Sequence, residues 1–258
     1  MHRLLIYAHY DAQARVRPYV LKNLRALSEL GEVRFSSTAP LPASEVDKVR
    51  PWASGVVLRE NRGFDFGQWS AALADTEPES WDEIVVTNSA LIGPLVPLEP
   101  LFERMDSRPC DFWGLNANAA FLPHLQSSFL VFKRRLLQSR SFRRFFESVL
   151  PYQTKGAIIC AYELGLTQFL RDEGFCGEAA FPRETLRQSW WQNWTVRRRL
   201  GPRVRRRMDN SIYYPDLLID AGIPYIAVGL LERNPARLNL APILKHLQNR
   251  GFSLDDLK

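Results

Sequence analysis

Cysteine is scarce in this chain of 258 residues. Its three cysteines, Cys110, Cys160 and Cys176, lie far apart and form no CxxC pair. The odd number and the wide spacing indicate neither a disulfide framework nor a cysteine-based zinc site. We therefore expect buried free thiols.

Long hydrophobic runs are also missing. No apolar stretch approaches the ~20 residues that a membrane-spanning helix needs. A strand-like run at residues 4–8 follows the start of the sequence directly, so no signal peptide is visible. We expect a cytoplasmic protein, either free or attached peripherally to the inner face of the cell membrane.

Two common nucleotide-binding motifs are absent. No GxGxxG follows the first strand-like run, and neither GxxxxGKS nor GxxxxGKT occurs in the sequence. These absences argue against a dinucleotide-dependent oxidoreductase and against a P-loop phosphotransferase.

What the sequence does contain is an alternation of strand-like and helix-like segments. Apolar runs typical of strands lie at 4–8, 32–36, 55–58, 83–87, 111–115 and 127–133, with helical patterns between the earlier ones. This alternation predicts one α/β domain over residues 1–258, with a mostly parallel (mixed) central sheet and helices on both faces.

The second half of the sequence has a more helical pattern. Apolar stripes predict helices at 136–150 and 157–174. We expect the chain to close with a helix at 215–221, a strand at 225–231 and a helical tail within 235–258.

A glycine-bearing turn at residues 60–69, ENRGFDFGQW, follows the strand-like run 55–58 and precedes a helical segment. Such turns bind ligands at the carboxyl ends of strands in open α/β sheets. Gly63 permits backbone conformations closed to other residues, while Asn61, Arg62 and Asp65 offer hydrogen bonds and charge. The structural alternative is an ordinary turn in which Asp65 caps the following helix.

Loops after three successive strands should converge on one edge of the sheet. A nucleotide would suit such an edge. In this interpretation Tyr7, His9 or Tyr10 stacks on a base, while Asn61 and Asp65 bind base or ribose. Packing of the aromatic side chains, and a satisfied polar cap for His9, are the alternatives.

The segment ENRGFDFG resembles the signature of the rhamnan synthesis protein F family, glycosyltransferase-like proteins of bacterial cell-surface polysaccharide assembly. Further resemblances follow in the same order at 85–95 (VVTNSALIGPL), 111–115 (DFWGL), 124–132 (HLQSSFLVF) and, more weakly, 162–167 (YELGLT). The resemblance implies a GT-A-like fold. It also implies transfer of a deoxysugar such as rhamnose from a nucleoside-diphosphate donor to a lipid-linked glycan acceptor.

The resemblance places a DxD motif, which holds a divalent metal on the donor diphosphate, at the end of the central strand. Here that position reads Thr87-Asn88-Ser89, with no carboxylate. Because Mg²⁺ prefers carboxylate oxygens, a bound Mg or Mn ion is in doubt. We include Asn88, Ser89 and Gly63 among the donor-binding residues, and Arg62 or a distant basic cluster could neutralise the diphosphate.

An inverting transfer needs a carboxylate that takes the proton of the acceptor hydroxyl. Glu163 and Asp111 are the candidates. Glu163 lies in an otherwise apolar helix start, where desolvation would raise its pKa, although a carboxylate there also suits the helix dipole. Asp111 has a structural role as its alternative.

Polar side chains before the predicted strand 127–133 could line an acceptor site, and these are His124, Gln126 and Ser127. A single histidine without a neighbouring carboxylate is a weak metal ligand, so we assign no metal-binding residue.

The net charge is +6, and a basic tryptophan-rich segment at 186–210 stands out. Its most prominent members are Trp190, Trp191, Trp194, Arg205, Arg206 and Arg207. Indoles beside guanidinium groups suit an anionic membrane surface or a lipid-linked pyrophosphate. A nucleic-acid partner is the less favoured interpretation, and a solvated basic loop is the structural one.

These features together predict a glycosyltransferase. The alternative is a non-catalytic family member that binds nucleotide or glycan in an assembly complex, which the missing DxD carboxylate favours.

Overall fold

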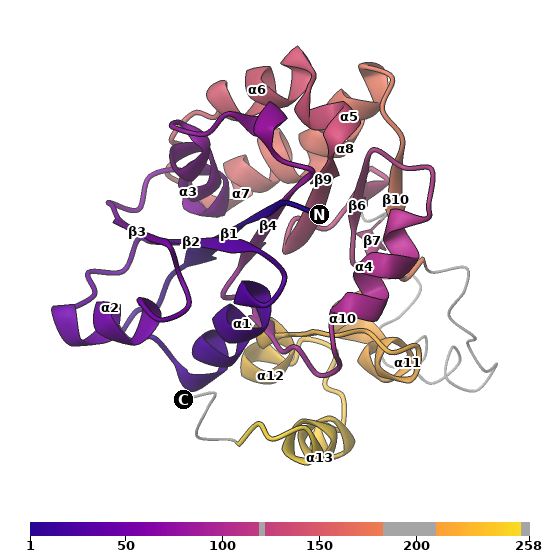
Figure 1. Cartoon of the computed structure of the whole chain (residues 1–258). Helices are drawn as coiled ribbons and strands as arrows, with labels where there is room; N and C mark the ends of the chain where they lie inside the picture. The colour runs from indigo at the N-terminus through magenta and orange to yellow at the C-terminus, as the bar shows by residue number, and fades with distance from the viewer. Residues whose placement is uncertain (119–121, 183–209, 254–258) are drawn as a thin grey trace.

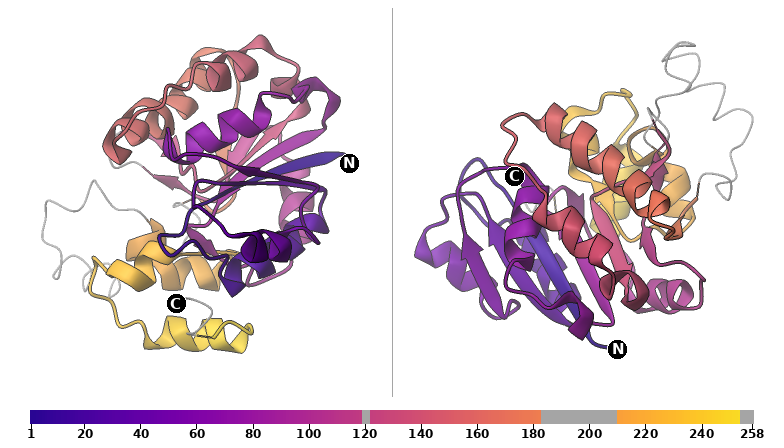
Figure 2. Two further views of the ribbon diagram at one scale, coloured as in Figure 1. Left: turned by 90° about the vertical axis from the view of Figure 1, so that its left-hand side faces the viewer. Right: turned by 90° about the horizontal axis from the view of Figure 1, so that it is seen from above.

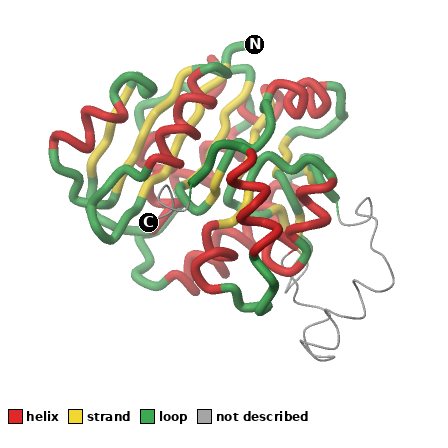
Figure 3. Tube along the Cα trace, turned by 90° about the horizontal axis from the view of Figure 1, so that it is seen from below, coloured by secondary structure: helices red, strands yellow, loops and turns green. Residues whose placement is uncertain are grey.

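The computed structural model describes residues 1–118, 122–182 and 210–253 (Figure 1). Seven strands form the central sheet, in the order β10-β6-β9-β4-β1-β2-β3. Their bounds are β1 (Arg3–His9), β2 (Glu32–Ser37), β3 (Gly55–Leu58), β4 (Glu83–Asn88), β6 (Phe112–Gly114), β9 (Phe129–Lys133) and β10 (Gly177–Ala179). All neighbouring pairs are parallel except those of β9, which runs antiparallel to β4 and β6. Figure 3 shows these strands side by side.

Helices cover both faces of the sheet, as Figure 2 shows from the side. One face carries α1 (Pro18–Ser28), α2 (Ala43–Val49), α4 (Glu99–Asp106), α10 (Asn210–Tyr213), α11 (Pro215–Asp220), α12 (Val228–Arg233) and α13 (Ala241–Asn249). The other carries α3 (Phe64–Leu73), α5 (Arg134–Leu137), α6 (Arg140–Glu147), α7 (Lys155–Ile158) and α8 (Leu164–Asp172). The expected α/β class, a mostly parallel mixed sheet with helices on both faces, is confirmed.

Alternation along each strand builds two apolar cores, one on each face. In β1, Leu5 and Tyr7 belong to the first core, whereas Leu4 and Ile6 belong to the second. All four side chains are fully buried, as expected where both faces of a parallel sheet are covered.

Small elements extend this framework. β5 (Leu91–Ile92) pairs with β11 (Ile226–Ala227), and β7 (Ala117–Asn118) pairs with β8 (His124–Leu125). A 3-10 turn, η1, spans Pro78–Ser80. Between α7 and α8 the helix continues through one π turn, η2 (Ile159–Glu163).

Two expectations about the second half are wrong in detail. The segment predicted as a strand at 225–231 is extended only at Ile226–Ala227, and helix α12 begins at Val228. Short apolar runs do not distinguish strand from helix, and the partner β5 is only two residues long. The predicted helix at 136–150 is divided into α5 and α6, the latter capped by the Ser139 side chain.

The three cysteines are free, but only Cys110 is buried; Cys160 and Cys176 are exposed. The expectation of buried thiols is therefore wrong for two of the three. The tail predicted within 235–258 contains α13, and residues 254–258 lie outside the described part.

Across residues 1–118, 122–182 and 210–253, none of the helices combines the length and apolar character that a bilayer crossing requires.

The reversed strand β9 decides which loops meet. The parallel strands β1 and β4 end at one edge of the sheet, at His9 and Asn88. Because β9 is antiparallel, its amino end lies at that same edge, with Phe129 opposite Thr87. Residues 124–128, which lead into β9, are thereby brought to the carboxyl edge.

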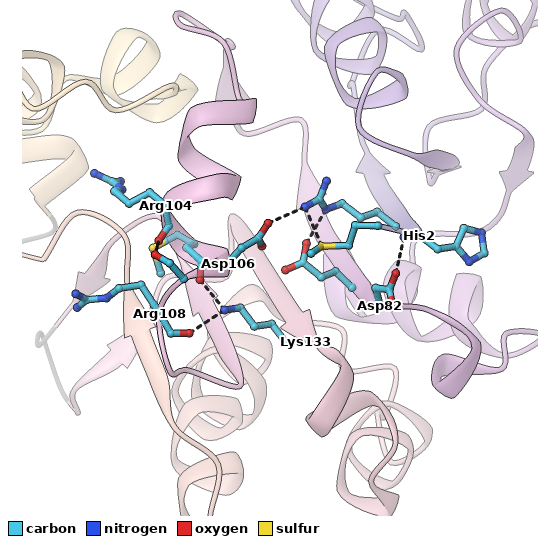
Figure 4. A network of polar contacts seen from close by, with 11 residues as sticks. His2, Asp82, Arg104, Asp106, Arg108 and Lys133 are labelled. Atoms are coloured by element: carbon cyan, nitrogen blue, oxygen red, sulfur yellow. Dashed lines mark hydrogen bonds and ion pairs between the residues drawn. The ribbon is translucent and has the colours of Figure 1, made fainter.

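Charged side chains at the opposite edge form a paired network (Figure 4). Arg3 contacts Glu83 at 2.6 Å and Asp106 at 3.4 Å. The Lys133 ammonium donates to the carbonyls of Met105 and Arg108 at 2.6 and 3.1 Å. Burial raises the pKa of Glu83 despite the opposing effect of Arg3, so this carboxylate depends on its partner.

We predict that Arg3→Met destabilises the fold by about 3 kcal/mol at pH 8, because it leaves a buried carboxylate unpaired. Urea unfolding followed by circular dichroism measures the loss. Arg50→Met is the control, because Arg50 and Asp47 are 67% and 68% exposed and such pairs contribute below about 1 kcal/mol. Equal losses in both variants would contradict the prediction.

Candidate functional site

The glycine-bearing turn leads directly into helix α3. Gly63 is the N-cap residue and has φ +82°, a conformation that favours glycine. A side chain at Gly67 would lie 2.1 Å from the Arg62 carbonyl oxygen, so the turn also requires glycine there. Asp65 lies in the first turn of α3 and not at its N-cap, so the expected capping role is wrong.

Asp65 and Asn88 meet across this edge. The Asn88 Nδ2 donates to Asp65 Oδ2 at 2.8 Å, and Asn88 Oδ1 accepts from the Ala90 backbone N–H at 3.1 Å. The pKa of Asp65 is raised to about 6, chiefly by burial; Lys155 and Asn88 lower it, and Glu163 adds a smaller upward effect. The end of β4 therefore lacks its own carboxylate but has the Asp65 carboxylate against it.

Glu163 ends the π turn and comes from the same side. Ser127 Oγ donates to Glu163 Oε2 at 3.1 Å, and His124 Nε2 lies 3.6 Å from Glu163 Oε1. Single π turns inside helices frequently occur at functional sites. Three residues predicted separately, Glu163, His124 and Ser127, are thus brought into contact.

The tautomer of His124 follows from its second contact. His124 Nδ1 lies 2.7 Å from the Leu122 carbonyl oxygen. Because a carbonyl oxygen only accepts hydrogen bonds, Nδ1 must carry a proton, and Nε2 is the nitrogen that faces Glu163. The His124 side chain is buried.

Tyr7 and His9 do not take part as expected. Tyr7 lies within the core and is fully buried, so it cannot stack on a base. His9 is also buried, its Nδ1 lies 2.8 Å from Ser37 Oγ, and burial lowers its pKa to about 4. The satisfied polar role, the alternative stated for His9, is the one the structure supports.

Exposed residues surround the Asp65–Asn88 contact. Tyr10 is 53% exposed, and its backbone N–H donates to Ser89 Oγ at 3.3 Å. Asn61 and Arg62 are exposed, and Arg62 pairs with Glu60 at 2.7 Å. Gln126 is half-buried and donates its backbone N–H to the Asn116 carbonyl at 3.0 Å.

Asp111 lies at the opposite edge of the sheet, level with Lys133 at the end of β9. Its Oδ2 accepts from Arg135 and from the Cys176 backbone N–H, at 2.6 and 2.8 Å. The structure therefore does not bring Asp111 to Asp65 and Glu163, and the catalytic interpretation of Asp111 is corrected to a structural one.

Lys155 is a site neighbour that the sequence did not single out. It is the first residue of α7, is exposed, and acts electrostatically on Asp65. The sequence offers only an indirect signal, Thr154, whose side chain caps this helix. The residues Trp190, Trp191, Trp194, Arg205, Arg206 and Arg207 lie outside the described part of the chain.

The seven-stranded mixed sheet with helices on both faces makes this an α/β protein, whose polar residues gather where open sheets of this class bind ligands. The chain belongs to the rhamnan synthesis protein F family, whose family model matches residues 33–251. The expected family is thereby confirmed.

Solved structures similar to this chain include three with low identity. A protein of Desulfovibrio desulfuricans G20 assigned as a nucleotide-diphospho-sugar transferase is 15% identical over 86% of this chain and 98% of its own, with a TM-score of 0.39. A cytidylyltransferase of Leptospira borgpetersenii is 13% identical over 86% and 96%, with a TM-score of 0.38. The glycosyltransferase GlyE of Streptococcus pneumoniae is 13% identical over 69% and 45%, with a TM-score of 0.38. Among curated proteins, none matches the sequence.

We predict that Asp65→Asn changes the pH dependence of stability. The folded pKa of about 6 exceeds the ordinary 3.8, so the folded protein binds the proton first as the pH falls. The Asp65 contribution is therefore fully present below about pH 4 and is lost as pH rises through about 6. Urea midpoints at pH 5 and 7.5 should show wild type losing stability relative to Asp65→Asn, and parallel curves would contradict this.

Proposed function

We propose that this protein is a glycosyltransferase that moves a sugar from a nucleoside-diphosphate donor to a polysaccharide acceptor. Membership of the rhamnan synthesis protein F family supports this activity. The observation that carries the proposal is that Asp65, Asn88 and Glu163, from three separate elements, come together at the carboxyl edge of the sheet.

The donor side of the site would consist of the turn and the end of β4. Asp65 and Asn88 offer one hydrogen-bonded polar unit, and Asn61 and Ser89 lie at its margin. Gly63 is buried and supports this side by allowing the left-handed turn that places Asp65. Exposed Tyr10 takes the stacking role that buried Tyr7 and His9 cannot provide.

Glu163 would act as the general base. In an inverting transfer its carboxylate takes the proton from the acceptor hydroxyl. The acceptor oxygen forms a bond to the anomeric carbon, and the nucleoside diphosphate leaves with the electron pair of the broken bond. Ser127 donates to Oε2 of Glu163, His124 Nε2 lies 3.6 Å from Oε1, and Gln126 completes the acceptor side.

The finer features of the reaction form part of the same proposal. We infer rhamnose as the sugar and a lipid-linked glycan as the acceptor because of the family. The basic segment at 186–210 would then contact an anionic membrane surface or the lipid pyrophosphate.

A non-catalytic role is the second candidate. Asn88 occupies the place of the expected DxD carboxylate, which favours a protein that binds nucleotide or glycan without turnover. Measuring nucleoside-diphosphate release in the presence of donor and acceptor separates the two functions.

We predict that Glu163→Gln lowers the rate of transfer about 10²–10⁴-fold, the usual contribution of a general base. Donor affinity should change little, because the amide has the same size and keeps hydrogen-bonding capacity. The rate is measured as nucleoside-diphosphate release, and the affinity is measured by calorimetry.

Asp172→Asn, an exposed change in α8, is the matched control and should retain full activity. A Glu163→Gln variant with an unchanged rate would defeat the assignment of Glu163 as base. If wild type also binds donor without turnover, the non-catalytic role is correct.

A second variant tests whether His124 supports Glu163 as the general base. We expect His124→Gln to lower kcat about tenfold with little change in KM, because Glu163 would lose the imidazole at its Oε1. The pH profile of kcat should also shift, since a titratable neighbour is removed. An unchanged profile together with a raised KM would instead support a direct contact between His124 and the acceptor.

A further inference from the structure

The family resemblance implies a divalent cation on the donor diphosphate, and the residues at the site can be compared with that requirement. Mg²⁺ needs near-octahedral oxygen ligands, usually including one or two carboxylates. Within residues 1–118, 122–182 and 210–253, no three His, Cys, Asp or Glu side chains form a group able to hold a metal ion.

Three oxygen atoms near the end of β4 accept hydrogen bonds from the protein, and these are Asn88 Oδ1, Asp65 Oδ2 and Glu163 Oε2. Both polar atoms of the Asn88 side chain are engaged, by Asp65 and by the Ala90 N–H. Both carboxylate oxygens of Glu163 face Ser127 and His124. One oxygen of Asp65 accepts from Asn88. These residues do not fit a divalent cation.

A diphosphate bound at this site would still require a positive charge to neutralise it. A diphosphate brought beside Asp65 and Glu163 would be repelled by two carboxylates. Arg62 is tied to Glu60 at 2.7 Å and is 62% exposed. The Arg59 guanidinium donates to the Gly67 carbonyl, and burial lowers its pKa. Arg59 is therefore engaged within the turn, whereas Arg62 sits in a weak, exposed pair and can contribute charge only from the rim of the site.

Lys155 lies where such a charge is needed. The segment before α7 packs on the turn, because a Cβ at Gly63 would lie 3.5 Å from Pro151 Cα. On the same helix, Tyr162 packs against Phe66 with ring centroids 5.5 Å apart. Figure 1 shows α7 beside α3, and the two helices are in contact. The start of α7 is thus held next to Asp65.

Within residues 1–118, 122–182 and 210–253, no partner holds the Lys155 side chain. It forms neither a hydrogen bond nor an ion pair with another described residue, and it is exposed. By contrast Lys48 contacts Glu45 at 2.6 Å, and Lys133 donates to two carbonyls. An exposed ammonium that acts electrostatically on Asp65 and has no partner among the described residues is available to bind an anion.

We propose that the donor diphosphate is bound without a divalent cation, and that the ammonium group of Lys155 supplies the neutralising charge. This inference rests on the proposed function, since it concerns the same donor site. Lysine binds phosphate as a point charge with three N–H donors. When the bond to the sugar breaks, the leaving diphosphate keeps the electron pair, and Lys155 stabilises the added charge without transferring a proton.

Nucleotide binding by the full-length protein tests this inference. UDP, GDP, dTDP, CDP and inorganic pyrophosphate are titrated separately by calorimetry, first in EDTA and then in Mg²⁺ or Mn²⁺. We expect at least one nucleotide to bind with an affinity that differs less than about twofold between the two conditions. Lys155→Gln should weaken its binding about tenfold, as expected for one charged hydrogen bond, whereas Lys155→Arg should retain most of it.

Lys48→Gln is the matched control, because Lys48 is on α2 across the sheet and should not affect binding. A second readout is the pKa of Asp65, observed by NMR. It should rise in Lys155→Gln, since Lys155 lowers it in the wild type.

A tenfold or larger gain of affinity on adding Mg²⁺ or Mn²⁺, or equal binding by Lys155→Gln and wild type, would overturn the inference. Absence of nucleotide binding in both conditions would defeat the proposed function as well. Metal-free, Lys155-dependent binding without transfer would leave this inference standing and would support the non-catalytic alternative.

Discussion

The reversed direction of β9 is the constraint on which the site depends. A wholly parallel strand in its place would carry residues 124–128 to the amino edge of the sheet, beside the Arg3–Glu83 network. Antiparallel pairing of β9 with both β4 and β6 instead brings His124 and Ser127 to the carboxyl edge. There they contact Glu163, while Asp65 and Asn88 arrive from α3 and β4. One strand direction thus joins the acceptor and donor halves of the proposed site.

Charge is arranged differently at the two edges of the sheet. At the amino edge, Glu83 and Lys133 have protein partners, and their role is to hold β1, β4 and β9 together. At the carboxyl edge, Asp65 has a raised pKa, and Lys155, which acts on it electrostatically, has no partner in the described part of the chain. A partly desolvated carboxylate that is ionised at neutral pH reduces the stability of the fold. Such a cost is found at functional sites in many proteins. An anionic ligand bound near Lys155, as proposed, would alter this charge balance.

Much of the proposed site was predictable because unusual residue types in local sequence patterns indicate it. Gly63 and Gly67 indicated a tight turn before a helix, and Glu163 was noticeable as a carboxylate in an apolar segment. Tyr7 and His9 were misinterpreted, because a strand end shows its residue types but not the depth at which they are buried. Asp111 was misplaced for a different reason, since it immediately precedes β6 and so lies at the amino edge of the sheet. Lys155 had only the indirect signal of Thr154, because a surface lysine becomes distinctive only once the fold brings it near Asp65.

The amino-acid sequence by itself determined the α/β class, the positions of most strands and helices, and the family, because apolar periodicity and glycine turns act over a few residues. Only the tertiary structure decided that Asn88 binds Asp65, that Glu163 faces His124, and that Asp111 does not join them. Those contacts depend on strand order and direction, which arise from packing two apolar cores against one sheet. No local pattern encodes such long-range pairing, so the composition of the site emerged only from the fold.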